Sequence, residues 1–217
     1  MRIGGKTMAI FNPQDIGAEL SRMLLDPSCY DPQKLREKLR QMLRQLSYKE
    51  GIFKLTSGRE SDFYVDGKLT ALDPVGSWLI GNCFCNIIST VCPDVKGVAG
   101  VTLGADPLVT ATSIVGLHRS LFLPQIIVRK EPKNHGTENQ LEEAATVPKN
   151  SALVLLDDVL TTGGTLYRIG IKALEKAGYT IAAILTILDR EEGGREFLAE
   201  KGYSNLHSIF TRTELLA

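Results

Sequence analysis

The most concentrated chemical signal in the sequence is a pair of adjacent carboxylates, Asp157 and Asp158, which follow the apolar run 152–156. Carboxylates at the end of a buried strand are costly unless they meet water, a cation or hydroxyl donors. Residues 161–165 read Thr-Thr-Gly-Gly-Thr and lead into a helical pattern. Glycine lets a backbone approach a ligand closely, and N–H groups at a helix start bind anions. The pattern predicts a phosphate site, with the carboxylates placed to bind sugar hydroxyls directly or through magnesium.

One other interpretation of this segment competes with a phosphate site. Asp, Thr and Gly are all common in a capped turn between a strand and a helix. Two acids followed by T-T-G-G-T are more concentrated than such a turn requires. A Walker A loop is excluded because no lysine follows the glycines.

A second cluster carries positive charge and follows the strand-like run 125–128. Its cationic side chains are Arg129, Lys130, Lys133 and His135. Pro132 and Gly136 interrupt any helix here. A solvated charged loop is the ordinary explanation for such a run. This loop, however, leaves the same edge of the predicted sheet as the acidic pair. Positive charge at that edge would suit a leaving group on which negative charge develops.

The elements that position both clusters alternate between strand-like and helical runs from about residue 51 onward. The expected strands are 97–101, 125–128, 152–156 and 181–188, and the expected helices are 107–117 and 164–177, the latter stopped by Gly178. This alternation predicts an α/β fold with a central, mostly parallel sheet flanked by helices. In such folds ligands bind beyond the carboxyl ends of the strands.

The first 45 residues predict a helical extension ahead of a domain that covers 46–217. Asp31-Pro32 is typical of a helix start. The apolar residues that follow at helical spacing are Leu35, Leu39, Met42, Leu43 and Leu46. A shorter helix is expected over 15–25. A helical cap on the main domain is favoured over a separate functional module, and translation could start at Met1 or Met8.

Composition narrows the function classes. The 217 residues carry 25 Lys plus Arg and 25 Asp plus Glu, so no basic excess points to nucleic acid. The four cysteines lack zinc-site spacing and are too few for a disulfide scaffold. Cys83, Cys85 and Cys92 are expected to pack as small apolar residues. No run reaches the roughly 20 apolar residues of a membrane span. Residues 1–11 do not read as a signal peptide, so a cytoplasmic protein without a membrane partner is predicted.

The segment 153–165, LVLLDDVLTTGGT, resembles the signature with which type I phosphoribosyltransferases bind phosphoribosyl pyrophosphate (PRPP). The resemblance implies that the acidic pair holds the ribose 2′ and 3′ hydroxyls and that the loop holds the 5′-phosphate. The implied PRPP-binding residues are Asp157, Asp158, Val159, Leu160, Thr161, Thr162, Gly163, Gly164 and Thr165. Mg²⁺ is the implied cofactor, bound through PRPP, with Asp157 and Asp158 as candidate ligands.

The basic loop matches R-K-E-x-K-x-H-G, the catalytic loop of orotate phosphoribosyltransferases. The resemblance implies a homodimer in which this loop reaches the PRPP of the neighbouring subunit. The implied catalytic residues, which contact the pyrophosphate, are Lys133, Arg129, Lys130 and His135.

Residues 53–66, FKLTSGRESDFYVD, resemble the hairpin that forms a hood, about 46–70, over the base in this family. Phe63 and Tyr64 then fall where the family packs against orotate, although core packing explains such a pair equally. Arg190 and Thr161 are implied to contact orotate, since arginine pairs with a carboxylate that orotate carries. An ion pair of Arg190 with Asp189 or Glu191 is the alternative.

Three positions depart from the family pattern. Thr56 stands where many members have lysine, and Lys54, two residues earlier, could partly substitute for it. Residues 104–106 read Gly-Ala-Asp where many members carry a lysine, and Glu143 stands where a glycine often follows the basic loop.

The resemblance implies an enzyme that converts orotate and PRPP to orotidine 5′-monophosphate and pyrophosphate, a step of pyrimidine (UMP) synthesis. The alternatives are a phosphoribosyltransferase for another base and a non-catalytic regulator that senses PRPP. The intact basic loop disfavours the regulator, because a regulator does not need to stabilise a leaving group.

Overall fold

The computed structural model describes residues 30–54, 60–131 and 140–217. Its centre is a six-stranded sheet with the order β5-β4-β3-β6-β7-β8. The strands are β3 (Val98–Val101), β4 (Gln125–Val128), β5 (Leu141–Glu143), β6 (Ala152–Leu160), β7 (Thr180–Asp189) and β8 (Leu206–Thr211). All neighbours are parallel except β5, which pairs antiparallel with β4. The predicted α/β fold with a mostly parallel sheet is therefore confirmed.

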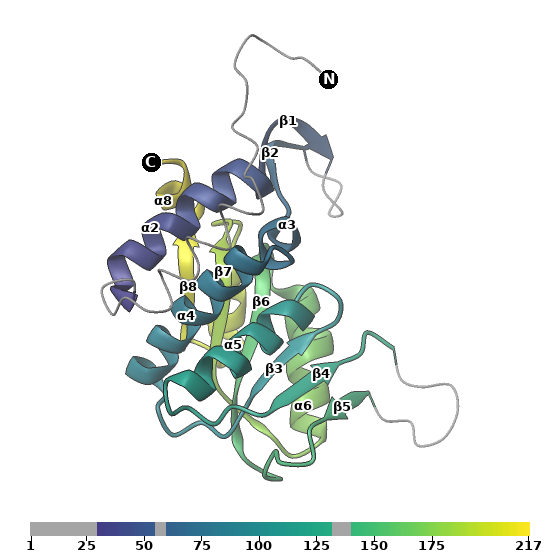
Figure 1. The fold of residues 1–217 in the computed structure, drawn as a ribbon. Coiled ribbons are helices and arrows are strands. Elements are labelled where there is room, and N and C mark those ends of the chain that lie inside the picture. The colour runs from purple at the N-terminus through teal and green to yellow at the C-terminus, as the bar shows by residue number, and fades with distance from the viewer. Residues whose placement is uncertain (1–29, 55–59, 132–139) are drawn as a thin grey trace.

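Helices cover both faces of this sheet. They are α2 (Pro32–Met42), α3 (Gly67–Ala71), α4 (Pro74–Val91), α5 (Asp106–His118), α6 (Lys172–Lys176), α7 (Gly194–Glu200) and α8 (Arg212–Leu216), with π-helical turns η2 (Leu43–Ser47) and η3 (Leu166–Ile171). Figure 1 shows α2, α4 and α5 in front of the sheet and α6 behind it. The two helical layers give the sheet one apolar core on each face.

The alternation of side chains along the strands builds these two cores. Val154 and Leu156 of β6 join the core beneath α4 and α5. Leu153 and Leu155 join the other core, with Ile171 of η3. Successive residues of a strand point to opposite faces, so an uninterrupted apolar run serves both layers. This is why the continuous apolar run before Asp157 identified a buried parallel strand.

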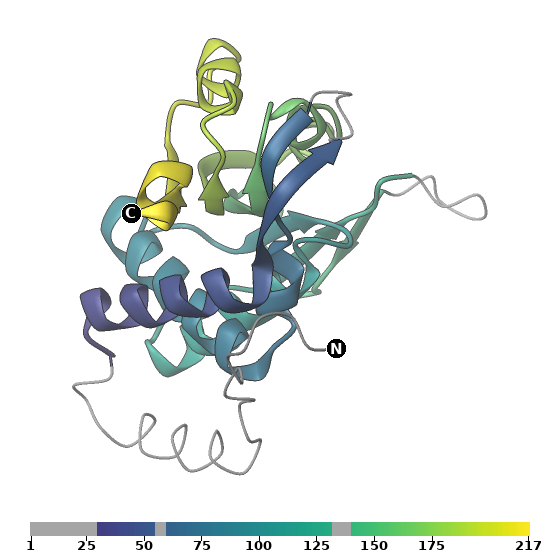
Figure 2. The same cartoon turned by 90° about the horizontal axis from the view of Figure 1, so that it is seen from above.

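A separate hairpin lies where the hood was predicted. Strands β1 (Tyr48–Lys54) and β2 (Glu60–Val65) pair antiparallel, with Tyr48 opposite Val65. Seen from above in Figure 2, the hairpin overlies the carboxyl-terminal edge of the sheet. The predicted pair of strands is confirmed, although β1 begins before Phe53. The turn at 57–59 lies outside the described residues.

Helix α2 begins as predicted at Asp31-Pro32. The Asp31 carboxylate accepts hydrogen bonds from the backbone N–H groups of Gln33 and Lys34. Leu35 and Leu39 are fully buried in the core that also holds α4. The division of the chain at residue 45 stays a prediction, and the helix expected over 15–25 lies outside the described residues.

The apolar stripe of α2 does not extend as far as predicted. Leu43 is fully buried, but Leu46 is 36% exposed, so its expected place on the buried face is wrong. The physical reason is that residues 43–47 adopt the wider π-helical turn η2. A wider turn changes which positions share a face, and an α-helical period no longer applies beyond Leu43.

Strand β6 is longer than the sequence indicated. The apolar run predicted a strand that ends at Leu156, yet pairing with β7 continues through Asp157, opposite Thr186, to Leu160, opposite Asp189. The helix that follows is stopped, as predicted, by Gly178, whose φ is +90°. The acidic pair therefore belongs to a strand and is held by the sheet ladder.

The remaining expectations concern the cysteines and membrane-spanning helices. Cys83 and Cys85 are buried within α4, as predicted, and burial raises the pKa values of their thiols to about 12 and about 11. Cys92, the C-cap of α4, is half-buried, and burial raises its pKa as well. No helix in the described part of the chain combines the length and apolar character needed to cross a membrane.

Candidate functional site

A cleft lies at the carboxyl-terminal edge of the sheet, where β3, β4 and β6 end. It has a volume of about 210 Å³ and is lined by Lys68, Val101, Thr102, Gly104, Lys130, Asp157, Asp158, Thr165 and Leu166. A smaller hollow of about 80 Å³ is lined by Asp157 and residues 159–166. The two share Asp157, Thr165 and Leu166. The acidic pair thus stands at the junction of a wide cleft and a narrow hollow, as an elongated ligand would require.

The two carboxylates differ in their surroundings. The backbone N–H of Asp158 donates to Asp157 Oδ1 over 3.1 Å, and the N–H of Val159 donates to Asp158 Oδ1 over 2.9 Å. Burial, and next the negative charge of Asp158, raise the pKa of the Asp157 carboxyl to about 8. The positive charge of Lys130 lowers the pKa of Asp157. An acid held this way favours a ligand that brings hydroxyl donors or a cation.

Glycines let other segments approach Asp158 closely. A Cβ atom added at Gly104 would lie 3.2 Å from Asp158 Oδ1, and one added at Gly67 would lie 3.1 Å from the Asp158 Cβ. The turn after β3 and the start of α3 therefore enclose this carboxylate from two sides. Larger residues at these positions would push into the cleft.

The loop 161–165 has the form of an anion cradle. Gly163 has φ +72°, a left-handed conformation that favours glycine, and a Cβ there would lie 3.1 Å from the carbonyl oxygen of Gly194. Thr162 and Thr165 are exposed. The helical turn η3 follows at once, so its first N–H groups face the loop. Val159 and Leu160, also predicted to bind PRPP, are strand residues that line the hollow.

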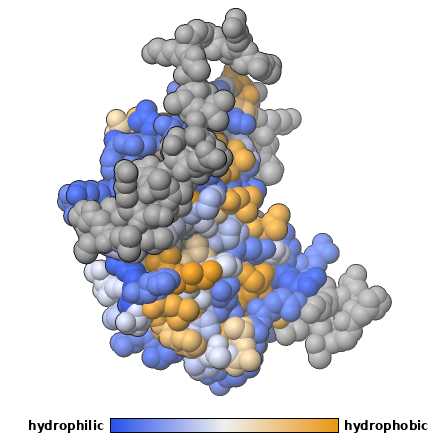
Figure 3. All heavy atoms as spheres, in the orientation of Figure 1, coloured by the Kyte–Doolittle hydropathy of each residue, from blue (hydrophilic) through white to orange (hydrophobic). Residues whose placement is uncertain are grey.

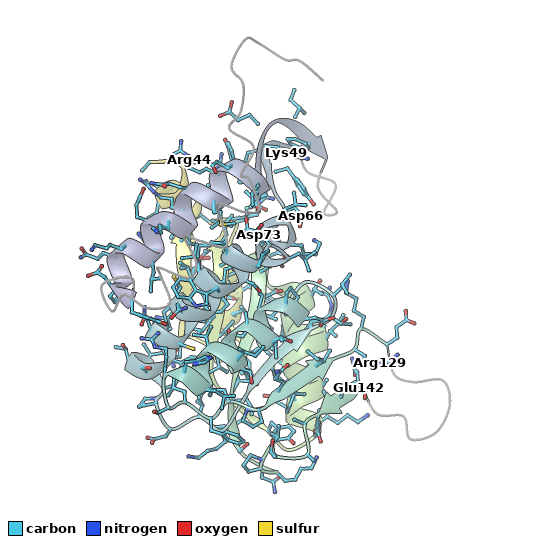
Figure 4. All side chains as sticks on the ribbon, viewed as in Figure 1. Arg44, Lys49, Asp66, Asp73, Arg129 and Glu142 are labelled. Carbon is cyan, nitrogen blue, oxygen red and sulfur yellow. The ribbon has the colours of Figure 1, made fainter. Side chains whose placement is uncertain are left out.

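The basic loop leaves the end of β4, and the structure brings one of its cations into the cleft. Lys130 lines the cleft beside both carboxylates. Arg129 instead forms an ion pair with Glu142, Nη1 to Oε1 2.9 Å. Figure 4 shows these two side chains together where the loop departs. The other two predicted cations, Lys133 and His135, lie outside the described residues.

Arg190 directly follows β7 and lies beside the start of the loop 161–165. Its backbone N–H donates to the Leu160 carbonyl oxygen over 2.9 Å. The side chain is almost fully buried and its Nε donates to Glu192 Oε1 over 2.7 Å. This buried ion pair with Glu192 differs from the surface pair with Asp189 or Glu191 that was the alternative. Asp189 pairs with Arg195 instead.

The two hood aromatics occupy different environments. Phe63 is 2% exposed, and the guanidinium groups of Arg190 and Arg212 lie 4.5 Å and 4.3 Å from its ring centroid. Tyr64 is 37% exposed and packs against Phe53. Core packing therefore describes Phe63 in this structure, whereas the Tyr64 ring is open to a ligand. Phe63 supports Arg190 from the hood side.

The turn after β3 is the segment in which Gly-Ala-Asp replaces a lysine-containing sequence, and Asp106 stabilises it. Thr102 Oγ1 donates to Asp106 Oδ2 over 2.9 Å, and Asp106 opens α5, where a negative charge stabilises the helix N-terminus. Glu143 forms an ion pair with Lys149. Thr56 and the side chain of Lys54 lie outside the described part of the structure.

Sequence reasoning missed Lys68, which lines the cleft from the start of α3. Its Nζ lies 2.7 Å from Asp66 Oδ1, and Asp66 also caps α3. In the sequence, Asp66-Gly67-Lys68 reads as an ordinary turn after a strand. The one signal for Lys68 in the sequence was a glycine between two charged residues. The fold brings Gly67 and Lys68 close to Asp158, and the sequence does not show this.

Comparison with known proteins agrees with this geometry. Residues 91–207 match the family model described as "Phosphoribosyl transferase domain". The chain is 39% identical over 189 residues to an orotate phosphoribosyltransferase of Nostoc sp., covering 87% of this chain and 89% of the relative. It is also 39% identical over 184 residues to the one from Aquifex aeolicus, covering 83% and 97%.

Solved structures give the same result. The Mycobacterium tuberculosis H37Rv orotate phosphoribosyltransferase in complex with Fe(III) dicitrate superposes with a TM-score of 0.68 at 28% identity, covering 83% of this chain and 98% of that chain. The same enzyme in complex with PRPP superposes with a TM-score of 0.67 at 25% identity, covering 84% and 99%. Sequence and fold therefore point to one group of proteins.

Proposed function

The chain belongs to the orotate phosphoribosyltransferase family, and we propose that the cleft at the end of β6 joins orotate to PRPP with release of pyrophosphate. The observation that carries this proposal is the continuity of the site. The narrow hollow at 161–165 and the wider cleft meet at Asp157, and Arg190 stands beside the same loop. The phosphate, ribose and pyrophosphate of PRPP and the orotate base would thus each lie beside a different part of the site.

The phosphate and the ribose are assigned first. The 5′-phosphate would lie in the hollow, bound by backbone N–H groups of 161–165 and by the Thr162 and Thr165 hydroxyls. The ribose 2′ and 3′ hydroxyls would donate to Asp157 and Asp158. Those hydroxyls supply the hydrogen bonds that a half-buried carboxylate requires. This assignment fixes the direction of PRPP along the edge of the sheet.

The base would lie between the hood and the end of β7. Arg190 would bind the orotate carboxylate, with Thr161 and the exposed Tyr64 ring beside it. Because Arg190 is held by Glu192 and packs on Phe63, its planar fork is already oriented. A base without a carboxylate would lack this charged contact with the guanidinium, which explains a preference for orotate over uracil.

Chemistry at this site is chiefly positioning and electrostatics. The bond between ribose C1′ and the pyrophosphate oxygen breaks as orotate N1 bonds to C1′, and N1 is an anion or nearly so. No side-chain nucleophile is required. Lys130, with Arg129, Lys133 and His135 of the loop, would neutralise the departing pyrophosphate. Arg129 must first leave Glu142, so we expect the loop to rearrange when PRPP binds.

Magnesium fits this set of donors. Within the described ranges no group of three or more His, Cys, Asp and Glu side chains could hold a metal by itself. Mg²⁺ commonly takes one or two carboxylates and completes its shell with substrate phosphates and water. Asp157 and Asp158 would therefore hold Mg²⁺ together with PRPP. The ion would supply further positive charge for the pyrophosphate.

We also propose that the protein is a homodimer whose subunits share the basic loop. Figure 3 shows apolar side chains gathered over α5 and the segments beside it. The exposed apolar residues of α3, α5 and the turns next to them are Leu69, Leu72, Leu103, Ile114, Leu117 and Phe122. A groove on this face shares Lys68 with the cleft. An apolar surface that adjoins the site suits a second copy, because its loop would then lie within reach.

The cytoplasmic location expected from the sequence stays a proposal.

Measurement of orotate turnover tests the proposed activity. The purified protein is incubated with PRPP, Mg²⁺ and orotate, and the loss of orotate absorbance is followed, with uracil and hypoxanthine in parallel. The proposal predicts turnover with orotate alone and its collapse in Lys133→Ala. Turnover with another base would reassign the base. Persistent PRPP binding without turnover of any base would leave a PRPP-sensing regulator.

A further inference from the structure

Lys68 is a charged residue of the cleft that the assignments above leave without a role. It follows the hood directly, in the first turn of α3, and its Nζ lies 2.7 Å from Asp66 Oδ1. The side chain is 37% exposed. It lines the cleft together with Lys130 and both carboxylates of the acidic pair. An ammonium group is therefore fixed at the mouth of the cleft and remains open to a ligand.

The position of Lys68 along the cleft decides which part of PRPP it faces. If the 5′-phosphate occupies 161–165 and the ribose occupies the acidic pair, the pyrophosphate must lie beyond Asp158, on the side away from the phosphate loop. Lys68, Thr102, Gly104 and Lys130 line the cleft but not the hollow of the phosphate loop. Lys68 thus lies at the pyrophosphate end.

The balance of charge at this end requires a cation. Asp66, Asp158 and Asp106 bring carboxylates to the segments that enclose it. Among the described residues that line the cleft, Lys68 and Lys130 are the only cationic side chains. Lys130 belongs to the basic loop, whereas Lys68 belongs to a helix. Lys68 therefore offers positive charge that does not depend on the position of the loop.

The contact with Asp66 orients Lys68 without using up its hydrogen bonds. An ammonium group carries three donors, and the bond to Asp66 uses one of them. That bond is the main cause that raises the pKa of Lys68, and the negative charge of Asp158 adds to it, so the group stays protonated at neutral pH. Two donors remain for pyrophosphate oxygens.

We propose that Lys68 binds the pyrophosphate group of PRPP, as a cation that helix α3 fixes in the cleft. The proposal rests on the proposed function of the cleft and assigns the residue to one part of its substrate. Its partner Asp66 is a positioning residue.

The test compares ligands that do and do not contain pyrophosphate. Dissociation constants are measured by calorimetry for PRPP, for pyrophosphate with Mg²⁺, and for orotidine 5′-monophosphate, which keeps the ribose, the phosphate and the base. In Lys68→Met, affinity for PRPP and pyrophosphate is expected to fall about 10- to 100-fold, as for a lost charged hydrogen bond. Affinity for the nucleotide stays within about twofold. Lys68→Arg should retain most of the pyrophosphate affinity.

Lys149→Met is the matched control, because Lys149 is also ion-paired with a carboxylate but precedes β6 at the opposite edge of the sheet. It should leave all three affinities unchanged. Unchanged pyrophosphate affinity in Lys68→Met would overturn the proposal. An equal loss for the nucleotide would overturn it too, because Lys68 would then act through the acidic pair or the fold. A wild-type protein that binds neither PRPP nor pyrophosphate would refute the proposed function itself.

Discussion

The guanidinium carbon of Arg190 lies 4.5 Å from the centroid of the Phe63 ring, so a residue of the hood supports the residue proposed to bind the base. Arg190→Lys removes the planar fork that matches a carboxylate. We expect the KM for orotate to rise about 10- to 100-fold, the scale of a charged hydrogen bond, with the KM for PRPP little changed. Phe63→Leu should raise the same KM by a smaller factor, because it removes only the support.

The control for Phe63→Leu is Phe84→Leu, which removes an equal volume from a fully buried position in α4. It should cost stability without changing the KM for orotate. Steady-state kinetics with either substrate varied would separate these effects. A rise in the KM for PRPP that equals the rise for orotate would contradict the assignment of Arg190 to the base.

Gly163 is expected to be needed for its conformation and for its close neighbours. In Gly163→Ala the left-handed backbone costs about 1–2 kcal/mol, and the new Cβ would lie 3.1 Å from the carbonyl oxygen of Gly194. We expect a fall in Tm of about 2–4 °C per kcal/mol and a loss of PRPP affinity. Thermal melting and calorimetry measure the two effects.

Gly202→Ala provides the matched control for Gly163→Ala. Gly202 has φ +95° and nothing within 4 Å of a built Cβ. The Gly202→Ala variant should lose a similar amount of stability and keep its affinity for PRPP. If both variants lose affinity alike, the loop 161–165 is not the phosphate cradle.

Asp157 is expected to make stability depend on pH in the absence of Mg²⁺ and PRPP. Its pKa of about 8 in the folded protein exceeds the ordinary value of 3.8, so the native state binds a proton more tightly than the unfolded state. Stability contributed by this group is therefore complete at low pH and is lost as the pH rises toward about 8. Asp157→Asn cannot titrate, and its Tm should exceed that of the wild type near pH 8. Melting curves over this range that run parallel would refute the prediction.

The apolar face is expected to hold two copies together. Ile114 is 54% exposed on α5 and lines the groove that shares Lys68 with the cleft. Ile114→Asp should shift the protein from dimer to monomer in analytical ultracentrifugation, because a charge would be buried at the interface. Turnover should fall with it, since each site would lose the partner's loop. Ile52→Asp, at an exposed position of the hood, should change neither. A wild-type monomer with full turnover would contradict the shared loop.

Much of the fold could be predicted because local pattern and tertiary context agree. The apolar run before Asp157 serves two cores at once, and such a run is typical of a buried parallel strand. Gly178 and Asp31 have the conformation or the hydrogen bonds that their residue types favour at helix ends. Leu46 was placed wrongly because a π-helical turn breaks the period on which the prediction depends.

The site could be predicted only in part, because sequence distance hides spatial neighbours. Asp157 and the loop after it are contiguous, so their chemistry is readable along the chain. Lys68 lies far from them in sequence and reaches the cleft through the fold. The Phe63 ring lies 4.3 Å from the guanidinium carbon of Arg212, which is at the other end of the chain. No local pattern could have revealed these two relationships.

The most direct test of the central claim is orotate consumption by the wild type and by the double variant Asp157→Asn, Asp158→Asn, with pyrophosphate release followed in the same reaction. The wild type should form one pyrophosphate for each orotate consumed. The double variant should remain folded and lose at least about 100-fold in kcat/KM, since two charged contacts to the ribose are removed. A double variant that keeps its rate would show that the acidic pair at the end of β6 does not bind the ribose.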